Sequence, residues 1–438
     1  MHIVLLSGGS GKRLWPLSND IRSKQLIPFF RQSDGSRQSM AQRVCGQVRR
    51  AVPDAKITIA TSKAQVSVLR NQLGEAVDIC VEPCRRDTFP AIALVSAYLH
   101  DVKGVDENEA VAVCPVDPYV EDSYFSAVHQ LTQLVGTGAG ELMLMGVEPT
   151  YASEKYGYIL PQNKETVSHV LSFREKPDAD AAQRYIDEGA LWNSGVFAYC
   201  LGYVLTRARQ LLGCSDYEGL LVAYESLEKI SFDYAVVEHE NNIGVLRYGG
   251  AWKDLGTWNT LTEIMEETTL GNAVLDDGCR NTHVVNEMDV PVLVMGAQNL
   301  VIAASPEGIL VADKAASSYM KPYVERISQP VMFAEKSWGS FRIIDVEDES
   351  LTIKVTLNAG HAMNYHSHAH RREIWTVVSG CGTVRLDGTV RPAAAGDVID
   401  IPAGMKHKIS ARERMVVIEV QVGSSISKED KIKWEEEN

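Results

Sequence analysis

A glycine-rich loop follows the first predicted strand of the chain. Residues 7–28 have the sequence SGGSGKRLWPLSNDIRSKQLIP, and the apolar run at residues 2–7 predicts a buried strand in front of the loop. Glycines let a backbone pass close to a ligand and point several N–H groups at one anion. Arg13 and Lys24 add positive charge close by in the sequence.

Two common phosphate-binding motifs do not fit this loop. A Walker loop requires Ser or Thr after its Gly-Lys pair, whereas Arg13 follows Lys12 here. The dinucleotide fingerprint requires a third glycine where this chain has Leu14. A plain glycine turn with solvated basic side chains is the structural alternative. Arg13, Pro16 and Lys24 at these spacings favour a loop that binds a nucleoside triphosphate.

Strands and helices alternate over the first half of the chain. Apolar runs predict strands, and 3.6-residue periodicity predicts helices between them. The predicted strands are 56–61, 77–81, 110–114 and 141–146, and the predicted helices are 38–51, 63–73, 88–100 and 124–135. This order predicts an α/β, Rossmann-like domain with a mostly parallel sheet covered by helices. Ligands bind such sheets at the carboxyl ends of the strands.

The pattern changes near Gly271. Residues 271–330 contain short β-rich runs, and residues 331–438 are almost purely β, with glycine turns at regular intervals. The last segment predicts a small barrel or sandwich, with a charged tail at 428–438 that forms a helix or a frayed end. We therefore predict three parts: 1–270, 271–330 and 331–438.

The amino-acid composition limits which kinds of partner and which cellular compartment fit this chain. The 438 residues carry 57 acidic and 43 basic side chains, for a formal charge of -14, which argues against a broad nucleic-acid or anionic-membrane surface. No apolar run approaches the roughly 18 residues of a membrane span, and a strand beginning at His2 leaves no room for a signal peptide. The eight cysteines form no CxxC pair, so we expect reduced thiols and a cytoplasmic protein.

Seven further blocks follow the glycine-rich loop. They are EPCRRDTFPAI (82–92), PVD (115–117), YGYI (156–159), FREKP (173–177), LWNSGVF (191–197), SFDYA (231–235) and WKDLGTW (252–258). The loop and these blocks, in this order, resemble the sugar-1-phosphate nucleotidyltransferases. The version of the loop with Trp15 is similar to that of the mannose-1-phosphate guanylyltransferases. The resemblance covers about residues 1–270.

This resemblance implies transfer of GMP from GTP to mannose 1-phosphate, with Mg²⁺ as cofactor. It implies metal binding by Asp117 and Asp254, and catalytic roles for both aspartates together with Arg13 and Lys24. The nucleotide-binding residues that it implies are Gly8, Gly9, Gly11, Arg13, Lys24, Glu82, Arg86 and Thr88. The sugar-phosphate residues that it implies are Gly157, Glu175, Lys176 and Asn193.

Physical chemistry agrees with this assignment but does not require it. Nucleotidyl transfer builds negative charge on oxygens, so its site needs cations and a metal more than a base. Without the resemblance, Asp117 or Asp254 would be read as a capping or turn residue, and the adjacent Glu175 and Lys176 as an exposed ion pair. Pro118 and Asp87 replace the family's usual His and Asn, so another base or another sugar 1-phosphate is the alternative.

The last domain contains two motifs of the cupin barrel. Gly360 to Gly380 fits G(x)5HxH(x)4E(x)6G, and Gly396 to His407 fits G(x)5PxGxxH. Residues two apart on a strand point the same way, so the barrel can gather the motif side chains. The predicted ligands of Zn²⁺ or another divalent transition metal are His366, His368, Glu373 and His407. A cupin without metal, whose histidines line a polar pocket, is the structural alternative.

The same domain resembles the isomerase domain of bifunctional enzymes with mannose-6-phosphate isomerase activity. KSWGSF at 336–341 and HAHRREIW at 368–375 carry this resemblance, and Arg371 aligns with an Arg assigned to the isomerase reaction. His366 and Ile374 replace the family's Gln and His. The sequence therefore leaves open whether the cupin interconverts mannose 6-phosphate and fructose 6-phosphate or has a structural or ligand-binding role.

These features predict a cytoplasmic enzyme of nucleotide-sugar synthesis. We expect GTP and sugar phosphates as its substrates, no nucleic-acid or membrane partner, and a homo-oligomer, a dimer. A rival of another class is a degenerate transferase fold that senses nucleotide sugars. Arg13, Lys24, Asp117 and Asp254 are all present, which disfavours that rival.

Overall fold

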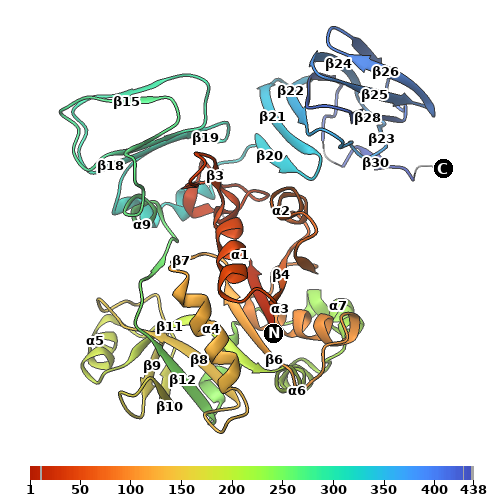
Figure 1. The fold of residues 1–438 in the computed structure, drawn as a ribbon. Helices are drawn as coiled ribbons and strands as arrows, with labels where there is room; N and C mark the ends of the chain where they lie inside the picture. The colour runs from red at the N-terminus through yellow and green to blue at the C-terminus, as the bar shows by residue number, and fades with distance from the viewer. Residues whose placement is uncertain (10–11, 428, 436–438) are drawn as a thin grey trace. The chain divides into compact units, whose positions relative to one another are not determined.

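The computed structural model describes residues 1–9, 12–427 and 429–435 (Figure 1). The chain divides into two compact units that interleave in sequence. Unit 1 consists of Met1–Gly9, Gln25–Val66 and Leu73–Gly256, and unit 2 consists of Ser10–Lys24, Ser67–Gln72 and Thr257–Asn438.

A nine-stranded sheet forms the centre of unit 1. Its strands, in spatial order, are β5 (Asp78–Glu82), β4 (Lys56–Ser62), β1 (His2–Ser7), β6 (Ala110–Pro115), β11 (Leu191–Cys200), β8 (Leu142–Val147), β12 (Ile243–Tyr248), β10 (Val167–Arg174) and β9 (Tyr158–Pro161). Strands β5, β4, β1 and β6 are parallel, as are β8 and β12, whereas β11 runs antiparallel between β6 and β8. The α/β architecture is confirmed, and the antiparallel strands lie in the half of the sheet that contains β9, β10 and β11.

Helices fill the connections of unit 1. They are α1 (Met40–Ala51), α3 (Thr88–Ala97), α4 (Ser123–Leu134), α5 (Ala179–Asp187), α6 (Leu201–Leu212), α7 (Tyr217–Ala223) and α8 (Phe232–Ala235). Helix α3 is buried along its whole length because it packs against the sheet and against α6, α7 and α8. Helix α1 instead begins with a capping box, in which Ser39 and Gln42 satisfy each other's backbone N–H groups.

Two small ribbons complete unit 1. Strands β7 (Pro118–Val120) and β13 (Trp252–Asp254) form one antiparallel pair, and β2 (Phe30–Arg31) and β3 (Arg37–Gln38) form another. The chain enters β7 just after the carboxyl end of β6, and β13 pairs with β7 there. That edge of the sheet is where an α/β fold places its ligands.

The predicted connector is a coil of parallel strands in unit 2. One face of the coil holds β14 (Thr269–Leu270), β16 (His283–Asn286) and β18 (Leu300–Ser305), with β19 (Gly308–Asp313) antiparallel at the edge; another holds β15 (Ala273–Leu275) and β17 (Val292–Val294). Val284, Val294 and Ile302 form the buried core of the coil.

The cupin barrel of unit 2 is built from two antiparallel sheets. The first contains β20 (Phe333–Lys336), β21 (Gly339–Val346), β22 (Ser350–Leu357), β29 (Met415–Val422), β24 (Arg372–Ser379) and β27 (Val398–Ile401). The second contains β26 (Thr389–Ala394), β25 (Cys381–Leu386), β28 (His407–Ala411), β23 (His366–His368) and β30 (Lys431–Lys433). The expectation of a helix or frayed end for the tail is wrong at β30, since this segment gains backbone hydrogen-bond partners by pairing with β23.

Short helical turns link these elements. They are α2 (Val66–Leu73), α9 (Trp258–Thr262), α10 (Lys321–Val324), η1 (Lys12–Leu14), η2 (Lys24–Leu26), η3 (Tyr98–Val102), η4 (Tyr224–Ser226), η5 (Val237–His239) and η6 (Ala316–Tyr319). The eight cysteines form no disulfide within the structure. Among the described helices, none combines the length and apolar character needed to cross a lipid bilayer.

Candidate active site and cupin metal centre

Two aspartates lie at the ribbon of β7 and β13. Asp117 directly precedes β7, and Asp254 is the last residue of β13, where it pairs with Pro118. Both aspartates line a cavity of about 240 Å³ in unit 1. The register therefore brings two aspartates that are 137 positions apart in the sequence to the same cavity.

The same cavity gathers most of the predicted sugar-binding residues of unit 1. Gly157, Glu175 and Asn193 line it together with the two aspartates. Lys176 is not one of the lining residues. Its ammonium group contacts the Glu175 carboxylate beside the cavity, and half of its side chain is exposed.

Gly157 is required at its position by the crowding of its neighbours. A Cβ atom there would lie 2.5 Å from Oε2 of Glu175, 2.9 Å from the ring of Phe173 and 3.3 Å from Cβ of Asn193. The carbonyl of Gly157 accepts a hydrogen bond from the backbone N–H of Asn193 at 2.8 Å. A glycine therefore allows the two polar side chains to approach the same part of the cavity.

Glu175 is held in place rather than solvated. Its side chain is 7% exposed, and its backbone N–H donates to Oε1 of Glu238 at 3.1 Å. Burial lowers the pKa of Lys176, but the carboxylates of Glu175 and Asp233 outweigh that effect and raise it, so the ammonium stays charged. Glu175 and Lys176 thus form an ion pair in which the lysine is half-exposed and the carboxylate is buried.

Asp233 was not among the predicted site residues, although it lies in the quoted SFDYA block. It lines the cavity from α8, and its Oδ1 accepts a hydrogen bond from Nδ2 of Asn193 at 2.7 Å. Burial, and then the charge of Glu175, raise the pKa of Asp233 to about 7. No spacing rule could have found this contact, because Asn193 and Asp233 are 40 residues apart in the sequence.

Aromatic rings form one wall of the cavity. Tyr156 and Trp252 line it with ring centroids 5.5 Å apart, and Trp192 packs behind them at 4.9 Å and 6.4 Å. Trp192 is only 4% exposed, so it packs as a core residue behind the cavity. Such a wall presents an apolar surface to a ligand.

The glycine-rich loop begins at the end of β1 in unit 1. Gly8 and Gly9 are exposed, and a Cβ on either would have no atom within 4 Å. Gly9 adopts φ +122°, which strongly favours glycine, and its carbonyl accepts from Nη2 of Arg85 at 3.0 Å. Gly11, also predicted to bind nucleotide, lies outside the described residues.

Three other predicted nucleotide-binding residues contact the segment before and within α8. Glu82 accepts from the Tyr224 hydroxyl at 3.0 Å, and Arg86 donates to the Tyr224 carbonyl at 3.2 Å. Oγ1 of Thr88 accepts from the backbone N–H of Phe232 at 2.8 Å. Burial raises the pKa of Glu82. These contacts give the three residues a positioning role in the fold.

Arg13 and Lys24 belong to unit 2, within η1 and η2. Arg13 is exposed and Lys24 is half-buried. The segment that carries them is anchored by other residues of unit 2. The anchors are hydrogen bonds from Trp258 Nε1 to the Trp15 carbonyl (3.0 Å), from Ser305 Oγ to the Pro16 carbonyl (2.6 Å), from Asn19 Nδ2 to Glu307 Oε1 (2.8 Å) and from Arg22 Nη1 to Glu287 Oε2 (2.7 Å).

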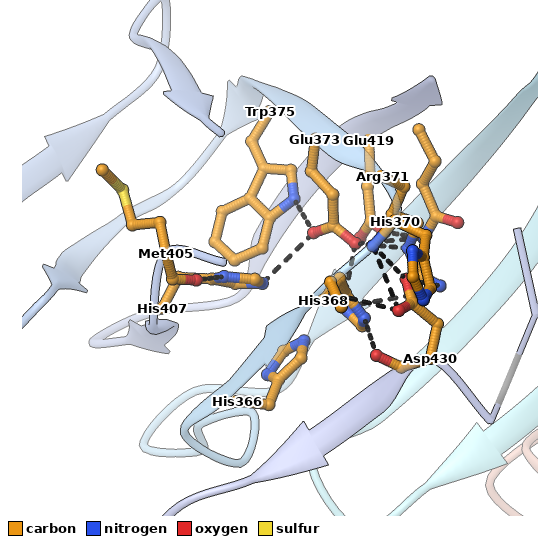
Figure 2. Close-up of polar contacts among 12 residues, drawn as sticks. His366, His368, His370, Arg371, Glu373, Trp375, Met405, His407, Glu419 and Asp430 are labelled. Carbon is orange, nitrogen blue, oxygen red and sulfur yellow. Dashed lines mark hydrogen bonds and ion pairs between the residues drawn. The ribbon is translucent and has the colours of Figure 1, made fainter. Parts of the chain in front are cut away.

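The four predicted metal ligands of the cupin meet between its two sheets (Figure 2). The side chains of His366, His368, Glu373 and His407 are all buried, and their ligand atoms lie within 4.8 Å of one another. His366 pairs with His407 across β23 and β28, and Glu373 enters from β24 of the other sheet. The motif spacing therefore predicted this cluster correctly.

Hydrogen bonds orient the three imidazoles toward a common centre. Each Nδ1 faces a backbone carbonyl, which can only accept, so Nδ1 carries the proton and the lone pair belongs to Nε2. The carbonyl partners are Asn364 for His366 (2.7 Å), Met405 for His407 (2.9 Å) and Asp430 for His368 (3.3 Å).

The donor set fits a divalent transition metal. Nε2 of His407 is buried, makes no hydrogen bond within the described part of the chain, and lies 3.3 Å from Oε2 of Glu373. Two acceptors that face each other at this distance suit a cation between them. Burial, followed by the charge of Lys431, lowers the pKa of His366 to about 2, which keeps that imidazole neutral and able to coordinate.

Arg371 lies beside this cluster and is buried. Its guanidinium donates to Oε1 of Glu373 at 3.2 Å, to Nε2 of His368 at 3.1 Å and to the Ser427 carbonyl at 2.8 Å (Figure 2). Asp430 accepts from the backbone N–H groups of the turn that follows β23. The segment at β30 thus supports the metal ligands from behind.

The fold and cavity of the first 270 residues define a nucleotidyl transferase. Residues 2–270 match the family described as Nucleotidyl transferase, and the chain belongs to that family. Residues 328–436 match the family described as Mannose-6-phosphate isomerase C-terminal. The predicted order of a transferase domain and a C-terminal isomerase-like cupin is confirmed.

Named relatives match nearly the full chain. The mannose-1-phosphate guanylyltransferase ManC of Salmonella typhimurium is 28% identical, over 100% of this chain and 98% of that protein. The xanthan biosynthesis protein XanB of Xanthomonas campestris is 29% identical, over 99% of this chain and 98% of that protein. A solved structure described as mannose-1-phosphate geranyltransferase from Thermus thermophilus is similar, with a TM-score of 0.62 and 28% identity, and covers 74% of this chain and 98% of that one.

Proposed function

We propose that the chain transfers GMP from GTP to mannose 1-phosphate, giving GDP-mannose and pyrophosphate. The cavity of unit 1 carries the proposal, because it combines two aspartates suited to a metal with several groups suited to hydroxyls. The printed names of the full-length relatives support the choice of guanine and mannose.

The transfer needs charge stabilisation more than proton transfer. A phosphate oxygen of the sugar 1-phosphate, already ionised at neutral pH, forms a bond to the α-phosphorus of GTP. The bond from that phosphorus to the bridging oxygen breaks, and pyrophosphate leaves with this oxygen and its electron pair. Negative charge rises on the phosphoryl oxygens, so we assign Arg13 and Lys24 to the triphosphate, as their motif predicts.

Asp117 and Asp254 would hold Mg²⁺, since this ion prefers carboxylate and phosphate oxygens. When bound, the ion supplies positive charge to the phosphate oxygens. The positions of Asp117, just before β7, and of Asp254, at the end of the paired strand β13, at one cavity support this role. Glu175 and Asn193 would hydrogen-bond the sugar, Lys176 would bind its phosphate, and Gly157 leaves room for them.

Competition among nucleotides tests this function. We expect pyrophosphate release to be fastest with GTP and mannose 1-phosphate in a panel that also contains ATP, CTP, UTP and other sugar 1-phosphates. A site that hydrogen-bonds a base edge disfavours the wrong base, because buried polar groups then stay unpaired. Faster turnover of CTP or UTP with every sugar would contradict the guanylyl assignment.

We also propose that the cupin binds one Zn²⁺ or another divalent transition metal through its three histidines and Glu373. Interconversion of mannose 6-phosphate and fructose 6-phosphate is the second candidate activity, and the matched isomerase family supports it. Such a reaction needs a polarised oxygen and a positioned base. Arg371, the residue assigned to it by resemblance, is fixed by Glu373 and His368 beside the cluster.

We further propose that the protein is a homodimer and that it lies in the cytoplasm. Val274 and Leu293 pair across β15 and β17 and are 58% and 67% exposed, and Met295 is exposed nearby. A second copy of the chain would cover this apolar surface. Analytical ultracentrifugation of the purified protein tests the oligomeric state.

A further inference from the structure

Asp233 and Asn193 form a fixed pair at the cavity. Nδ2 of Asn193 donates to Asp233 at 2.7 Å, while Oδ1 of Asn193 accepts from the backbone N–H of Gly195 at 3.0 Å. These two contacts distinguish the oxygen from the nitrogen of the amide and fix its rotation. Asp233 therefore determines which hydrogen-bonding groups Asn193 offers to a ligand.

Asp233 also lines the cavity itself, together with Glu175. A carboxylate offers about four acceptor sites, and Asn193 takes one of those on Asp233. The oxygens of these two carboxyl groups can accept hydrogen bonds from hydroxyls. The part of the cavity formed by Asp233, Asn193 and Glu175 therefore suits the hydroxyls of a sugar.

We propose that Asp233 is a sugar-binding residue, whose carboxylate accepts a hydrogen bond from a ring hydroxyl and directs Asn193 toward the same ring. The inference rests on the proposed function, since it assigns a specificity-determining residue to that substrate. It adds a ligand group to the four that the motifs predict.

Replacing the carboxylate tests the proposal. Asp233→Asn keeps the shape of the side chain but removes its charge and places a donor next to Nδ2 of Asn193. We expect kcat/KM for the sugar 1-phosphate to fall about 10- to 100-fold, mainly through KM, because a buried hydroxyl loses its acceptor. The KM for GTP should stay within about twofold of the wild-type value.

Deoxy analogues of the sugar 1-phosphate identify the hydroxyl. The wild-type enzyme should use one monodeoxy analogue much less efficiently than the parent sugar 1-phosphate. In Asp233→Asn the difference between that analogue and the parent should be much smaller, because the carboxylate that accepts from the missing hydroxyl is already absent. Asp216→Asn is the matched control. Asp216 accepts from the backbone N–H of Gly219 at 2.8 Å as the N-cap of α7, and it does not line the cavity. Asn caps a helix as well as Asp does, so this variant should behave as wild type.

Three results would overturn the inference. The first is a wild-type KM for the sugar phosphate in Asp233→Asn, and the second is unchanged discrimination among the deoxy analogues. The third is a lowered melting temperature with equal losses toward every substrate, which would show that Asp233 acts only on the fold. Failure of the proposed function is separate, because the wild-type enzyme itself would then release no pyrophosphate with any sugar 1-phosphate in the panel.

Discussion

Gly157 shows how a residue without a side chain controls its neighbours. The Glu175 carboxylate occupies the space that a Cβ at position 157 would need. Gly157→Ala should therefore displace Glu175 and raise KM for the sugar 1-phosphate about tenfold or more, with a smaller effect on KM for GTP. Steady-state kinetics with each substrate varied in turn measures both constants.

Gly249→Ala is the control for this substitution. A Cβ at Gly249 would have nothing within 4 Å, and its φ is not in the positive range, so kinetics and stability should stay near wild type. Equal KM values for Gly157→Ala and the wild-type enzyme would show that Glu175 is not a sugar ligand.

Residues whose spacing is set by one strand or one motif could be predicted from the sequence. His366 and His368 are two apart on a strand, so their common direction follows from local geometry. The contact of Asp233 with Asn193 depends on how α8 docks beside the cavity, and local patterns do not encode it. For the same reason, the packing of Arg86 and Thr88 against Tyr224 and Phe232 could not be read from their motif.

At the scale of elements, a partly buried ion pair joins α6 to the turn between η5 and β12. Glu240 accepts from the hydroxyl of Tyr203 at 2.7 Å and from Arg207 at 2.5 Å, and its side chain is 8% exposed. Burial alone would raise the pKa of Glu240. The hydrogen bonds from Tyr203 and Arg207, together with those from the backbone N–H groups of Asn241 and Asn242, outweigh it and lower the pKa from 4.5 to about 2. The folded state thus favours the ionised carboxylate.

This contribution to stability has a defined pH window. It is fully present above the unfolded pKa near 4.5 and is lost as the pH falls from there toward 2. Glu240→Gln should lower the free energy of unfolding by about 2 kcal/mol at pH 7 and by much less near pH 2.5. Urea denaturation at both pH values measures this, with the exposed Glu218→Gln as control. An equal cost at both pH values would contradict the assignment.

Long apolar runs predicted the strands of unit 1 well, because β1, β4 and β6 are largely buried and lie close to the predicted ranges. Short strands were harder to predict from the sequence. The short strands of the coil at 269–313 form backbone hydrogen bonds with strands of the next turn of the coil, and β30 forms them with β23. Such pairings depend on distant residues, so a short run such as Lys431–Lys433 carries no local signal.

At the scale of the whole molecule, the cupin should hold its metal independently of transfer activity. Protein purified without added metal should contain about one divalent transition metal ion per chain, and His368→Ala should lose most of it, since a ligand is removed. Elemental analysis by mass spectrometry measures both. His361 is exposed and outside the cluster, so His361→Ala should retain the metal. Absence of metal from the wild-type protein and both variants would overturn the site.

The interleaving of the two units limits how this gene can be recombined. Residues 12–24 are encoded near the start of the gene, yet Trp15, Asn19 and Arg22 are hydrogen-bonded to groups encoded some 240 to 290 codons later. If only the first 270 codons of this gene were joined to the remainder of another gene, the Arg22 guanidinium, which is 4% exposed, would be separated from its carboxylate at Glu287. Natural or engineered chimeras should therefore join within the segment between the coil and the barrel, so that the loop travels with the coil on which it folds.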